Sequence, residues 1–284
     1  MPLVAVTKKK ADIGIIILNY NNLHDECLST LGQAAAATTR TVQVVIVDNN
    51  STHMTADDRI LQHLPEALVV QRKQNPGFAR SINVGAACVN ATHYFFLNPD
   101  TKLIQLSILD TLVEYLNAHP DVGMVSPKIT NFDGSRQDTC RRFPTWYQPI
   151  VQRTRLAETT WGKNYSKSFL MEDFDQSSER NIDWMQGSAF MMPEQVWHDV
   201  GGFDERYWLY FEDVDLCRRM WETQKRVVYY PGTVLAHAFA RTSATISNPI
   251  IGIIKNRALR GHIVSWMKYQ WKWLGKKHPV VPTM

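Results

Sequence analysis

Short apolar runs alternate with longer amphipathic stretches through the N-terminal half of the chain. The runs are rich in β-branched and aromatic residues and occupy 13–18 (IGIIIL), 42–47 (VQVVIV), 67–70 (ALVV) and 94–97 (YFFL). Continuous apolar runs of this length are typical of strands that are covered on both faces, as in parallel sheets. Helical patterning fills the intervals at 25–37, 55–64, 79–90 and 105–118. The alternation predicts βαβ units, and therefore an α/β fold with a mostly parallel sheet flanked by helices.

The second half continues this alternation less regularly. A strand with a turn before it is predicted at 184–193 (WMQGSAFMMP), a short helix at 194–200 and a further strand at 227–230 (VVYY). A loop dense in aromatic residues, 203–211, leads into an amphipathic helix that begins at Glu212. The sheet pattern lapses at 140–149 (CRRFPTWYQP), where we expect loops that contact an acceptor or a donor phosphate. For each residue of that segment taken singly, an ordinary surface loop is the simpler interpretation.

Composition excludes several classes of protein. With 284 residues, of which 44% are hydrophobic and 20% charged, the chain can bury a large core, so dominant disorder is excluded. No stretch reaches the ~18 uninterrupted apolar residues of a membrane span. The opening MPLVAVTKKK places its charges after a short apolar run, the reverse of a secretion signal. The four cysteines form no C-x-x-C pair, which fits a reducing compartment. We therefore expect a cytoplasmic protein.

The charge of the chain is unevenly distributed. Seven of the 31 Lys and Arg side chains lie beyond residue 248, where there is no Asp or Glu, so the first 248 residues carry 24 basic against 27 acidic side chains. Aromatic and aliphatic residues interleave with the basic ones at 250–274. Such a tail fits a helix lying on the inner face of an anionic membrane, and equally a helix packed on the main domain. Gly252 and Gly261 argue against one unbroken helix. The tail could also bind nucleic acid, but the acidic balance of the rest argues against a broad nucleic-acid-binding surface.

Polar residues follow three of the predicted strands in the first half. They are Asn19 after the first strand, Asp48 and Asn50 after the second, and Asn98 and Asp100 after the strand at 94–97. The carboxyl ends of parallel strands form the ligand-binding edge of such sheets. A carboxylate at position 48 could accept hydrogen bonds from ribose hydroxyls or a base edge, or it could simply form an Asx turn. No glycine-rich dinucleotide or P-loop motif is present, which argues against dehydrogenases and kinases.

The segment 75–85 (NPGFARSINVG) joins a turn to the start of a helix. Gly77 would let backbone amides approach a ligand, Arg80 adds a positive charge, and helix N-termini attract phosphate. An ordinary loop-to-helix junction explains the same residues. Asp100 could bind a divalent cation, since Mg²⁺ and Mn²⁺ prefer oxygen ligands, and a neutral His237 would suit the same site. A plain Asn-Pro-Asp turn and a structural histidine are the alternatives.

Three carboxylates open the helix that begins at Glu212. The helix dipole stabilises their ionised forms, which is also a purely structural explanation for them. Asp215 lies three and four residues before Arg218 and Arg219, a spacing suited to ion pairs, so it is the weakest candidate for catalysis. Glu212 and Asp213 project about 100° apart, so that one can face a cleft while the other braces the loop. Either is a candidate general base.

Taken in order, the motifs ILNYNN, VDNNS, NPGFARSINVG, FLNPD, GSAFMMP, GGFDERYWLYFEDVDLCRR and the later His237 resemble glycosyltransferase family 2, with its GT-A fold. Within that family they are similar to the rhamnosyltransferase-like and galactofuranosyltransferase-like enzymes of bacterial surface polysaccharides. The resemblance covers about 12–243. It implies a GT-A domain at 12–248, with a nucleotide-sugar-binding half at 12–104 and an acceptor and catalytic half at 105–248. An extension at 1–11 and a basic helical tail at 249–284 would flank it.

The resemblance also implies roles for individual residues. Asp213 matches the base of inverting members, with Glu212 beside it, and Asp100 matches the metal-binding D-x-D position, where Asn98 replaces the usual first aspartate. His237 matches a metal ligand of related galactofuranosyltransferases, so Mg²⁺ or Mn²⁺ is the expected cofactor. The donor site is expected to comprise Asn19, Asp48, Asn50, Asn75, Gly77, Arg80, Asn83, Asn98 and Asp100, and the acceptor site Trp208, Tyr210 and Arg142.

The expected reaction is a single displacement at the anomeric carbon with inversion. dTDP-rhamnose is the first choice of donor and UDP-galactofuranose or another UDP-sugar the next, and the acceptor is a glycan or an undecaprenyl-diphosphate-linked glycan. A sugar nucleotidyltransferase would require a glycine-rich loop with a basic residue after the first strand, which LNYNN lacks. A non-catalytic sugar-binding module would not need the Glu212-Asp213 pair.

Overall fold

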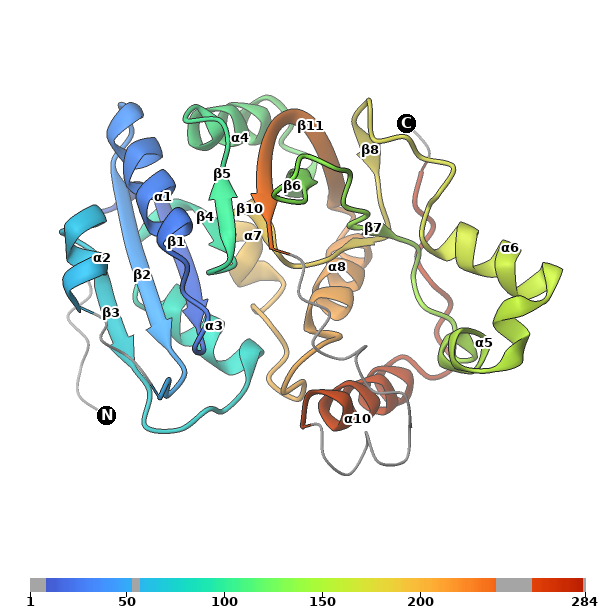
Figure 1. The fold of residues 1–284 in the computed structure, drawn as a ribbon. Helices are drawn as coiled ribbons and strands as arrows, with labels where there is room; N and C mark the ends of the chain where they lie inside the picture. Colours follow the sequence, from blue (N-terminus) through green and yellow to red (C-terminus); the bar gives the residue numbers. More distant parts are fainter. Residues whose placement is uncertain (1–8, 53–56, 239–256, 283–284) are drawn as a thin grey trace.

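The computed structural model describes residues 9–52, 57–238 and 257–282, and its centre is a twisted sheet with helices on both faces (Figure 1). The first half comprises β1 (Ala11–Asn19), α1 (Asp25–Ala37), β2 (Val42–Asp48), α2 (Asp57–His63), β3 (Leu68–Gln71), α3 (Phe78–Ala87), β4 (Ala91–Leu97), β5 (Thr101–Leu103) and α4 (Ile108–Ala118). Apart from the short strand β5, which was not predicted, these elements match the sequence-based expectations to within a few residues. The first two residues expected for α2 lie outside the described ranges.

The second half is more irregular. It comprises β6 (Val122–Thr130), β7 (Cys140–Arg141), α5 (Gln148–Arg153), the 3-10 helix η1 (Arg155–Glu158), α6 (Thr160–Phe169), β8 (Arg180–Asn181), β9 (Trp184–Met185), β10 (Ala189–Pro193), α7 (Glu194–Asp199), α8 (Glu212–Glu222), β11 (Arg226–His237) and α10 (Arg257–Lys272). The segment expected as a strand at 184–193 is divided into β9 and β10. The strand expected at 227–230 extends to His237, and this extension carries the histidine to the edge where β4 ends.

The main sheet has the strand order β3-β2-β1-β4-β10-β6-β11-β5, with β8 paired to β11 off this path. The four strands from β3 to β4 are mutually parallel, as are β6 and β11. β10 lies antiparallel between β4 and β6 and joins the two halves into one sheet. The expected mostly parallel α/β sheet is therefore confirmed.

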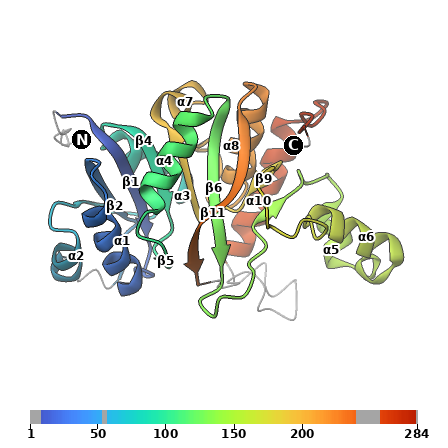
Figure 2. The same cartoon turned by 90° about the horizontal axis from the view of Figure 1, so that it is seen from above.

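Side chains of the sheet alternate between two cores, one on each face. On β1, Ile13, Ile15 and Ile17 pack into the core under α1 and α4, whereas Ile16 and Leu18 face the opposite core. The opposite core is covered by α3, α7, α8 and part of α10, as the view from above shows (Figure 2). Because both faces of the sheet are buried, the side chains of its strands are mainly apolar. The polar side chains therefore gather at the edge formed by the carboxyl ends of the strands.

Several features of the second half were not expected from the sequence. β6, which lies inside the sheet, was not predicted. α5, η1 and α6 form a small helical group to one side of the sheet, where the sequence predicted loops at 140–149 and no element between 150 and 183 (Figure 1). α10 also runs through Gly261, so the expectation of a broken helix there is wrong. A Cβ at Gly261 would come within 3.0 Å of the Trp208 ring, so the glycine lets α10 pack closely on the aromatic loop.

The helix α10 packs on the main domain, as one of the two interpretations of the tail expected. Its inward residues Leu259, Ser265 and Tyr269 are buried, as is Trp273 just beyond its end. Residues 249–256, including Gly252 and four of the tail's isoleucines, lie outside the described ranges. Across the described residues, no helix combines the length and apolar character needed to cross a membrane.

Candidate active site

Hydrogen bonds connect the polar loops that follow β1, β2 and β4. The amide Nδ2 of Asn19 donates to Oδ1 of Asp48 over 3.0 Å, and the backbone N–H of Asn22 donates to Oδ1 of Asn19 over 3.1 Å. Nδ2 of Asn22 in turn donates to Oδ2 of Asp100 over 3.0 Å. The structure thus brings Asn19, Asp48 and Asp100 into one network at the carboxyl edge of the sheet.

Asp48 is buried and held on three sides. Besides Asn19, its carboxylate accepts the backbone N–H of Ser51 over 3.0 Å and the Ser51 hydroxyl over 2.5 Å. This is the Asx turn that the sequence allowed as the structural explanation. Asn50 is exposed and lies in the left-handed region at φ 66°, which displays its side chain on the outer surface of the turn.

The loop at 75–77 connects the nucleotide-side loops to the aromatic loop 203–211. Nδ2 of Asn49 donates to Oδ1 of Asn75 over 3.1 Å and to the carbonyl of Gly77 over 3.3 Å. Gly77 has φ 104° and a Cβ there would collide with the Trp208 carbonyl, so only glycine fits. The N–H of Phe78 donates to that same carbonyl over 2.7 Å.

Arg80 and Asn83 do not join this network. Arg80 lies 3.2 Å from Glu205 in an exposed ion pair, and Asn83 exchanges two hydrogen bonds with the backbone of Phe203. Both residues fasten α3 to the loop 203–211. A donor contact by either residue would require these bonds to be exchanged, so their expected roles remain predictions.

A ring nitrogen of His237 and a carboxylate oxygen of Asp100 face each other. Nε2 of His237 lies 3.3 Å from Oδ1 of Asp100, which is buried and receives no hydrogen bond within the described part of the chain. Nδ1 of His237 faces Oε1 of Gln137 over 2.9 Å, and the Gln137 amide nitrogen donates to Oδ1 of Asn131 and to the His237 carbonyl. Oε1 of Gln137 can only accept, so Nδ1 donates to it, and in the neutral imidazole Nε2 directs its lone pair at Asp100.

This arrangement fits a divalent cation. Two facing acceptors without a proton between them are stabilised by a bound cation, and imidazole nitrogen and carboxylate oxygen both ligate Mn²⁺. Asn98 lies beside them, with Nδ2 at 3.5 Å from Nε2 of His237. In the ranges described, no three His, Cys, Asp or Glu side chains gather as a closed metal cage. Two protein ligands are what Mg²⁺ and Mn²⁺ use when substrate phosphates supply others.

Glu212 and Asp213 lie at the first turn of α8. Glu212 is buried and its Oε2 has no hydrogen-bond partner in the described chain, and this burial, together with the charge of Asp213, raises the pKa of Glu212 well above its ordinary value. Burial also raises the pKa of Asp213, to about 6, although the backbone N–H groups of Val214 and Gly187 lower it. Burial thus makes both carboxyl groups weaker acids than usual. Desolvation outweighs the helix dipole here.

Asp213 lies near the turn that holds Asp100. Its Oδ2 accepts the N–H of Gly187 over 3.3 Å, and the carbonyl of the next residue, Ser188, accepts the N–H of Asn98 over 2.8 Å. The antiparallel pairing of β10 with β4 produces this proximity, since Ala189 pairs with Leu97. A base candidate and a candidate cation-binding pair therefore lie at one edge of the sheet.

The backbone before α8 adopts two successive left-handed residues. Tyr210 has φ 66° and Phe211 has φ 69°, conformations that bulky side chains rarely occupy. Strain of this kind gathers at functional sites, where surrounding contacts maintain it. Trp208, in the same loop as Tyr210, packs over Gly77, so the expected acceptor residue Trp208 lies beside the loop at 75–77, whereas the Tyr210 ring contacts His262.

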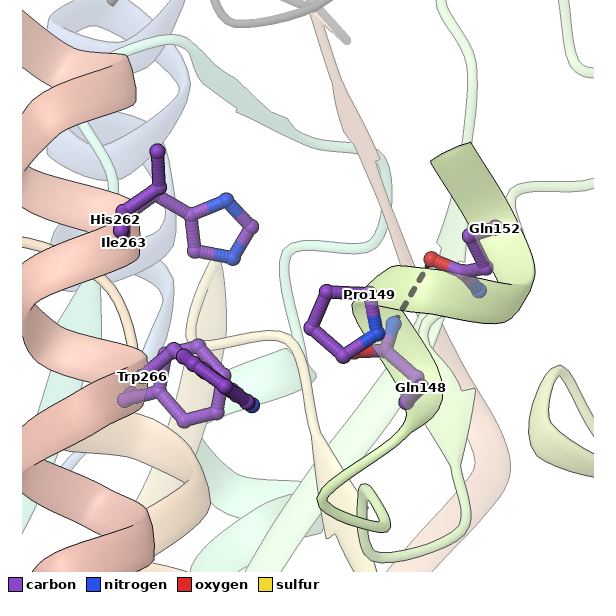
Figure 3. A pocket seen from close by; sticks show the side chains of 7 residues that line it. Gln148, Pro149, Gln152, His262, Ile263 and Trp266 are labelled. Atoms are coloured by element: carbon purple, nitrogen blue, oxygen red, sulfur yellow. Dashed lines mark hydrogen bonds between the residues drawn. The ribbon is translucent and has the colours of Figure 1, made fainter. Parts of the chain in front are cut away.

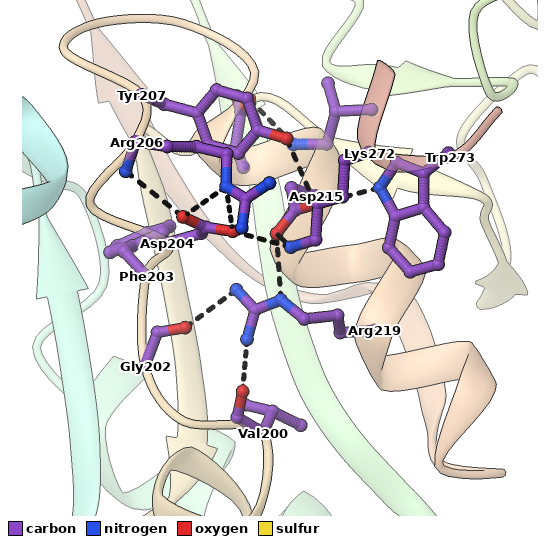
Figure 4. Close-up of polar contacts among 12 residues, drawn as sticks. Val200, Gly202, Phe203, Asp204, Arg206, Tyr207, Asp215, Arg219, Lys272 and Trp273 are labelled. Atoms are coloured by element: carbon purple, nitrogen blue, oxygen red, sulfur yellow. Dashed lines mark hydrogen bonds and ion pairs between the residues drawn. The ribbon is translucent and has the colours of Figure 1, made fainter. Parts of the chain in front are cut away.

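Asp215 has a structural role, as its spacing suggested (Figure 4). It is fully buried and accepts bonds from Arg219 at 2.8 Å, Lys272 at 2.8 Å and the Trp273 indole at 2.9 Å. The expected pairing with Arg218 is wrong in one respect, because Arg218 turns the other way and donates to the Tyr269 hydroxyl and to the carbonyls of Lys276 and Lys277. Arg218 therefore fastens the C-terminal segment to α8, whereas Arg219 donates to the carbonyls of Val200 and Gly202.

Arg142 also lies apart from the polar network. It forms an ion pair with Asp183 over 3.1 Å, while Asp183 accepts the N–H of Phe143 over 2.8 Å. Sequence reasoning missed Gln137, Asn22 and Gly187, which orient His237, Asp100 and Asp213 respectively. Asn22 stands in the polar run NYNN and could have been noted, whereas no sequence signal marked Gln137.

A family profile described as "Glycosyltransferase like family 2" matches residues 11–249. The chain belongs to this family. One curated relative is the N-acetylglucosaminyl-diphospho-decaprenol L-rhamnosyltransferase of Mycobacterium tuberculosis, 28% identical over 224 residues that span 75% of this chain and 72% of the relative. Another is the rhamnosyltransferase WbbL of Escherichia coli K12, 24% identical over 201 residues, 68% of this chain and 69% of that protein.

Solved structures share the fold of this glycosyltransferase. GalNAc-T7 with UDP, GalNAc and Mn²⁺ superposes with a TM-score of 0.65 at 13% identity, covering 93% of this chain and 49% of its own. The mannosyltransferase PcManGT from Pyrobaculum calidifontis, in complex with GDP-Man and Mn²⁺, gives a TM-score of 0.55 at 15% identity, over 94% of this chain and 71% of its own. The GT-A fold expected from the motifs is thereby confirmed.

Proposed function

We propose that this family 2 glycosyltransferase transfers a sugar from a nucleotide-sugar donor to an acceptor hydroxyl by a single displacement that inverts the anomeric centre. The observation that carries the proposal is the position of Asp213, an ionised carboxylate two hydrogen bonds away from the turn that bears Asp100. Asp213 removes the proton of the acceptor hydroxyl as the oxygen attacks the anomeric carbon, and the nucleoside diphosphate leaves from the opposite side. No covalent enzyme intermediate is required.

The donor side is formed by the network at the edge of the sheet. Asp48 and Asn19 hold the nucleoside, and the loop at Asn75 and Gly77 brings backbone amides to the diphosphate. Asp100 and His237 would hold Mg²⁺ or Mn²⁺, and the positive charge of the ion would offset the charge of the departing diphosphate. The two facing acceptor atoms of this pair support the assignment.

For the donor we propose dTDP-rhamnose, with UDP-galactofuranose or another UDP-sugar as the alternative. The support comes from the two rhamnosyltransferase relatives. The name of the mycobacterial relative specifies a sugar carried on a diphospho-polyprenol. By that likeness the acceptor is a lipid-linked glycan, as in the synthesis of a bacterial surface polysaccharide such as an O-antigen.

The outward face of α10 is the surface that we propose for contact with an anionic membrane. Val264, Met267, Trp271 and Leu274 recur at three- and four-residue spacing and are exposed, Trp271 to 79%. Lys276 and Lys277 follow directly after this apolar stripe. A basic helix with an exposed aromatic face suits a surface where lipid-linked acceptors diffuse.

A panel of nucleotide sugars tests the proposed function. Purified protein is incubated with dTDP-rhamnose, UDP-galactofuranose, UDP-glucose and GDP-mannose, each with Mn²⁺, and nucleoside diphosphate release is measured with and without a lipid-linked acceptor. Acceptor-stimulated release from one donor supports the proposal. A protein that binds nucleotide sugars without releasing diphosphate from any of them is a non-catalytic binding module.

A further inference from the structure

A cavity of about 130 Å³ lies between α5 and α10, beside the loop that precedes α8 (Figure 3). It is lined by Gln148, Pro149, Gln152, Phe211, His262, Ile263 and Trp266. His262 and Trp266 on α10 face Pro149 and Gln148 on α5 across the opening. Two segments separated by about a hundred residues thus form one pocket, and none of its lining residues belongs to the donor-side network.

The walls of the cavity combine flat apolar surfaces with a few polar groups. Phe211 and Trp266 supply aromatic rings, and the His262 ring is held 5.5 Å from Phe211, centroid to centroid. Gln148 Nε2 donates to Oε1 of Gln152 over 2.7 Å. The Oε1 of Gln148 and the Nε2 of Gln152 take no part in this bond and can bond to a ligand. Nε1 of Trp266 is buried and has no hydrogen-bond partner in the described structure.

An unpaired buried indole N–H requires an acceptor oxygen. Nothing within the described protein supplies one, so a ligand oxygen entering the cavity would satisfy it. Small-molecule sites have this composition, with apolar and aromatic walls and a few polar groups that fix orientation. A saccharide ring matches both properties, because it has a flat face of C–H groups and a rim of hydroxyls.

We propose that this cavity binds a single pyranose ring of the acceptor, an inference that rests on the proposed glycosyltransferase function. An apolar cavity of about 150 Å³ takes up one benzene ring, so the present cavity has the size of one six-membered ring. A polyprenol chain is far larger than this volume and offers no hydrogen-bonding group to the glutamine amides or to the indole N–H. The geometry therefore favours the sugar over its lipid carrier.

The cavity is correctly placed for an acceptor sugar. Phe211, which forms part of its wall, immediately precedes Glu212 and stands two residues before Asp213. Its left-handed conformation turns the chain sharply at this point, so that the aromatic wall and the base emerge from the same bend. A ring held against Phe211 and Trp266 would place the acceptor close to the carboxylate that takes its proton.

The substitution Trp266→Phe tests the proposal because it removes the Nε1 donor and keeps an aromatic ring. The probe is N-acetylglucosaminyl diphosphate carrying a short citronellyl chain, assayed with the donor selected from the panel. We expect KM for this probe to rise about three- to tenfold, as for the loss of one hydrogen bond, while acceptor-independent donor hydrolysis is unchanged. Trp161→Phe, the same change at an exposed tryptophan of α6 outside the cavity, is the matched control and should leave KM unchanged.

The outcomes separate the two proposals. An unchanged KM in Trp266→Phe overturns the pocket assignment while leaving the glycosyltransferase function intact. If Trp266→Phe loses donor hydrolysis through misfolding, the KM for the same probe is measured in Gln152→Ala, at an exposed residue of the cavity wall. An unchanged KM in that variant overturns the pocket assignment. If the wild-type protein releases no diphosphate at all, saturation-transfer NMR with the same probe still applies. Transfer to the pyranose protons that weakens in Trp266→Phe supports the pocket, and transfer to the citronellyl protons alone overturns it.

Discussion

Two adjacent carboxyl groups at the start of α8 have different surroundings. Within the described chain Glu212 has no partner for Oε2, and burial together with the charge of Asp213 holds its pKa well above the ordinary value. Asp213 accepts two backbone N–H groups, and burial raises its pKa to about 6. A base with a pKa close to the working pH combines adequate ionisation with adequate basicity.

Removing the charge of Asp213 should abolish most turnover. In Asp213→Asn we expect kcat to fall roughly 100-fold or more, because general-base catalysis contributes about that factor. Donor affinity should persist, since the donor-side residues are untouched. Asp199→Asn, at the exposed end of α7, is the control for a lost surface carboxylate. Wild-type turnover in Asp213→Asn would contradict the assignment of the base.

The rate should depend on pH through the same group. The pKa of Asp213 is raised to about 6, so the base is protonated and inactive below that pH and ionised above it. We therefore expect log(kcat/KM) to be level above about pH 7 and to decline by about one unit per pH unit well below pH 6. Stopped assays between pH 4.5 and 8.5 measure this profile. An acid limb centred near pH 4 would mean that burial does not control this carboxylate.

The pair Asp100 and His237 should bind metal through its facing oxygen and nitrogen. Nucleoside diphosphate with Mn²⁺ should raise Tm more than nucleoside diphosphate alone, because a ligand selective for the folded state stabilises it. In Asp100→Ala and His237→Ala this Mn²⁺-dependent increment should disappear. His198→Ala, at an exposed histidine, is the control. Retention of the full increment in both site variants would exclude the pair as the metal site.

At the scale of elements, α8 is the connection between the chemistry and the C-terminal segment. Its first turn carries Glu212 and Asp213, and its next residues hold α10 through Asp215 and Arg218. Lys272 bonds to Asp204 at 2.7 Å and to Asp215 at 2.8 Å, so it also ties the loop 203–211 to α10. The position of the catalytic loop therefore depends on the tail.

Breaking this connection should be costly. Lys272→Met leaves the fully buried Asp215 with one fewer cationic partner, and removal of one member of a buried ion pair costs about 3–5 kcal/mol. Because Arg219 and Trp273 remain bonded to Asp215, we expect a loss near the lower end of that range. Urea unfolding measures the change. Lys277→Met, at an exposed side chain, should stay within about 0.5 kcal/mol, and equal effects for the two variants would contradict this interpretation.

At the scale of the whole molecule, α10 has two faces with separate tasks. The inward face belongs to the core, so its lysines are not all available to lipid: Lys268 donates to the Arg206 carbonyl and Lys272 is paired. The outward stripe keeps its apolar side chains exposed. Deleting the tail would remove core residues as well as this surface, so substitutions on the outward face separate the two tasks.

The double variant Met267→Ser, Trp271→Ser should weaken membrane association without unfolding the domain. We expect less protein to sediment with phosphatidylglycerol-containing vesicles, because the buried apolar area at the interface shrinks. Trp161→Ser, at an exposed tryptophan on α6, is the control. Equal sedimentation of the variant and the wild-type protein would remove the membrane proposal, whereas an altered far-UV spectrum would show that the stripe serves folding instead.

Much of the first half could be predicted because its signals are local. The strands 13–18 and 42–47 are apolar since both faces of a central sheet are buried, and this pattern is visible in a few consecutive residues. The polar residues that follow these strands are also visible in a few consecutive positions, so the edge of the sheet proposed for binding could be predicted as well. The helices α5 and α6 could not be predicted. Their residues are held by aromatic contacts such as that of Tyr147 with Trp161, which produce no regular spacing of apolar residues in the sequence.

The sequence by itself determined the alternation of elements, the GT-A sheet and the family, since these depend on periodicity and on motifs along the chain. Only the tertiary structure decided which candidates meet. Asp48, Asp100 and His237 lie at one edge of the sheet, and Asp215 bonds to the C-terminal segment. Arg80 and Arg142 form ion pairs elsewhere, and α5 and α10 together form a cavity. Such pairings depend on contacts between residues tens to hundreds of positions apart, and burial, which sets the protonation of Glu212 and Asp213, exists only after the chain has folded.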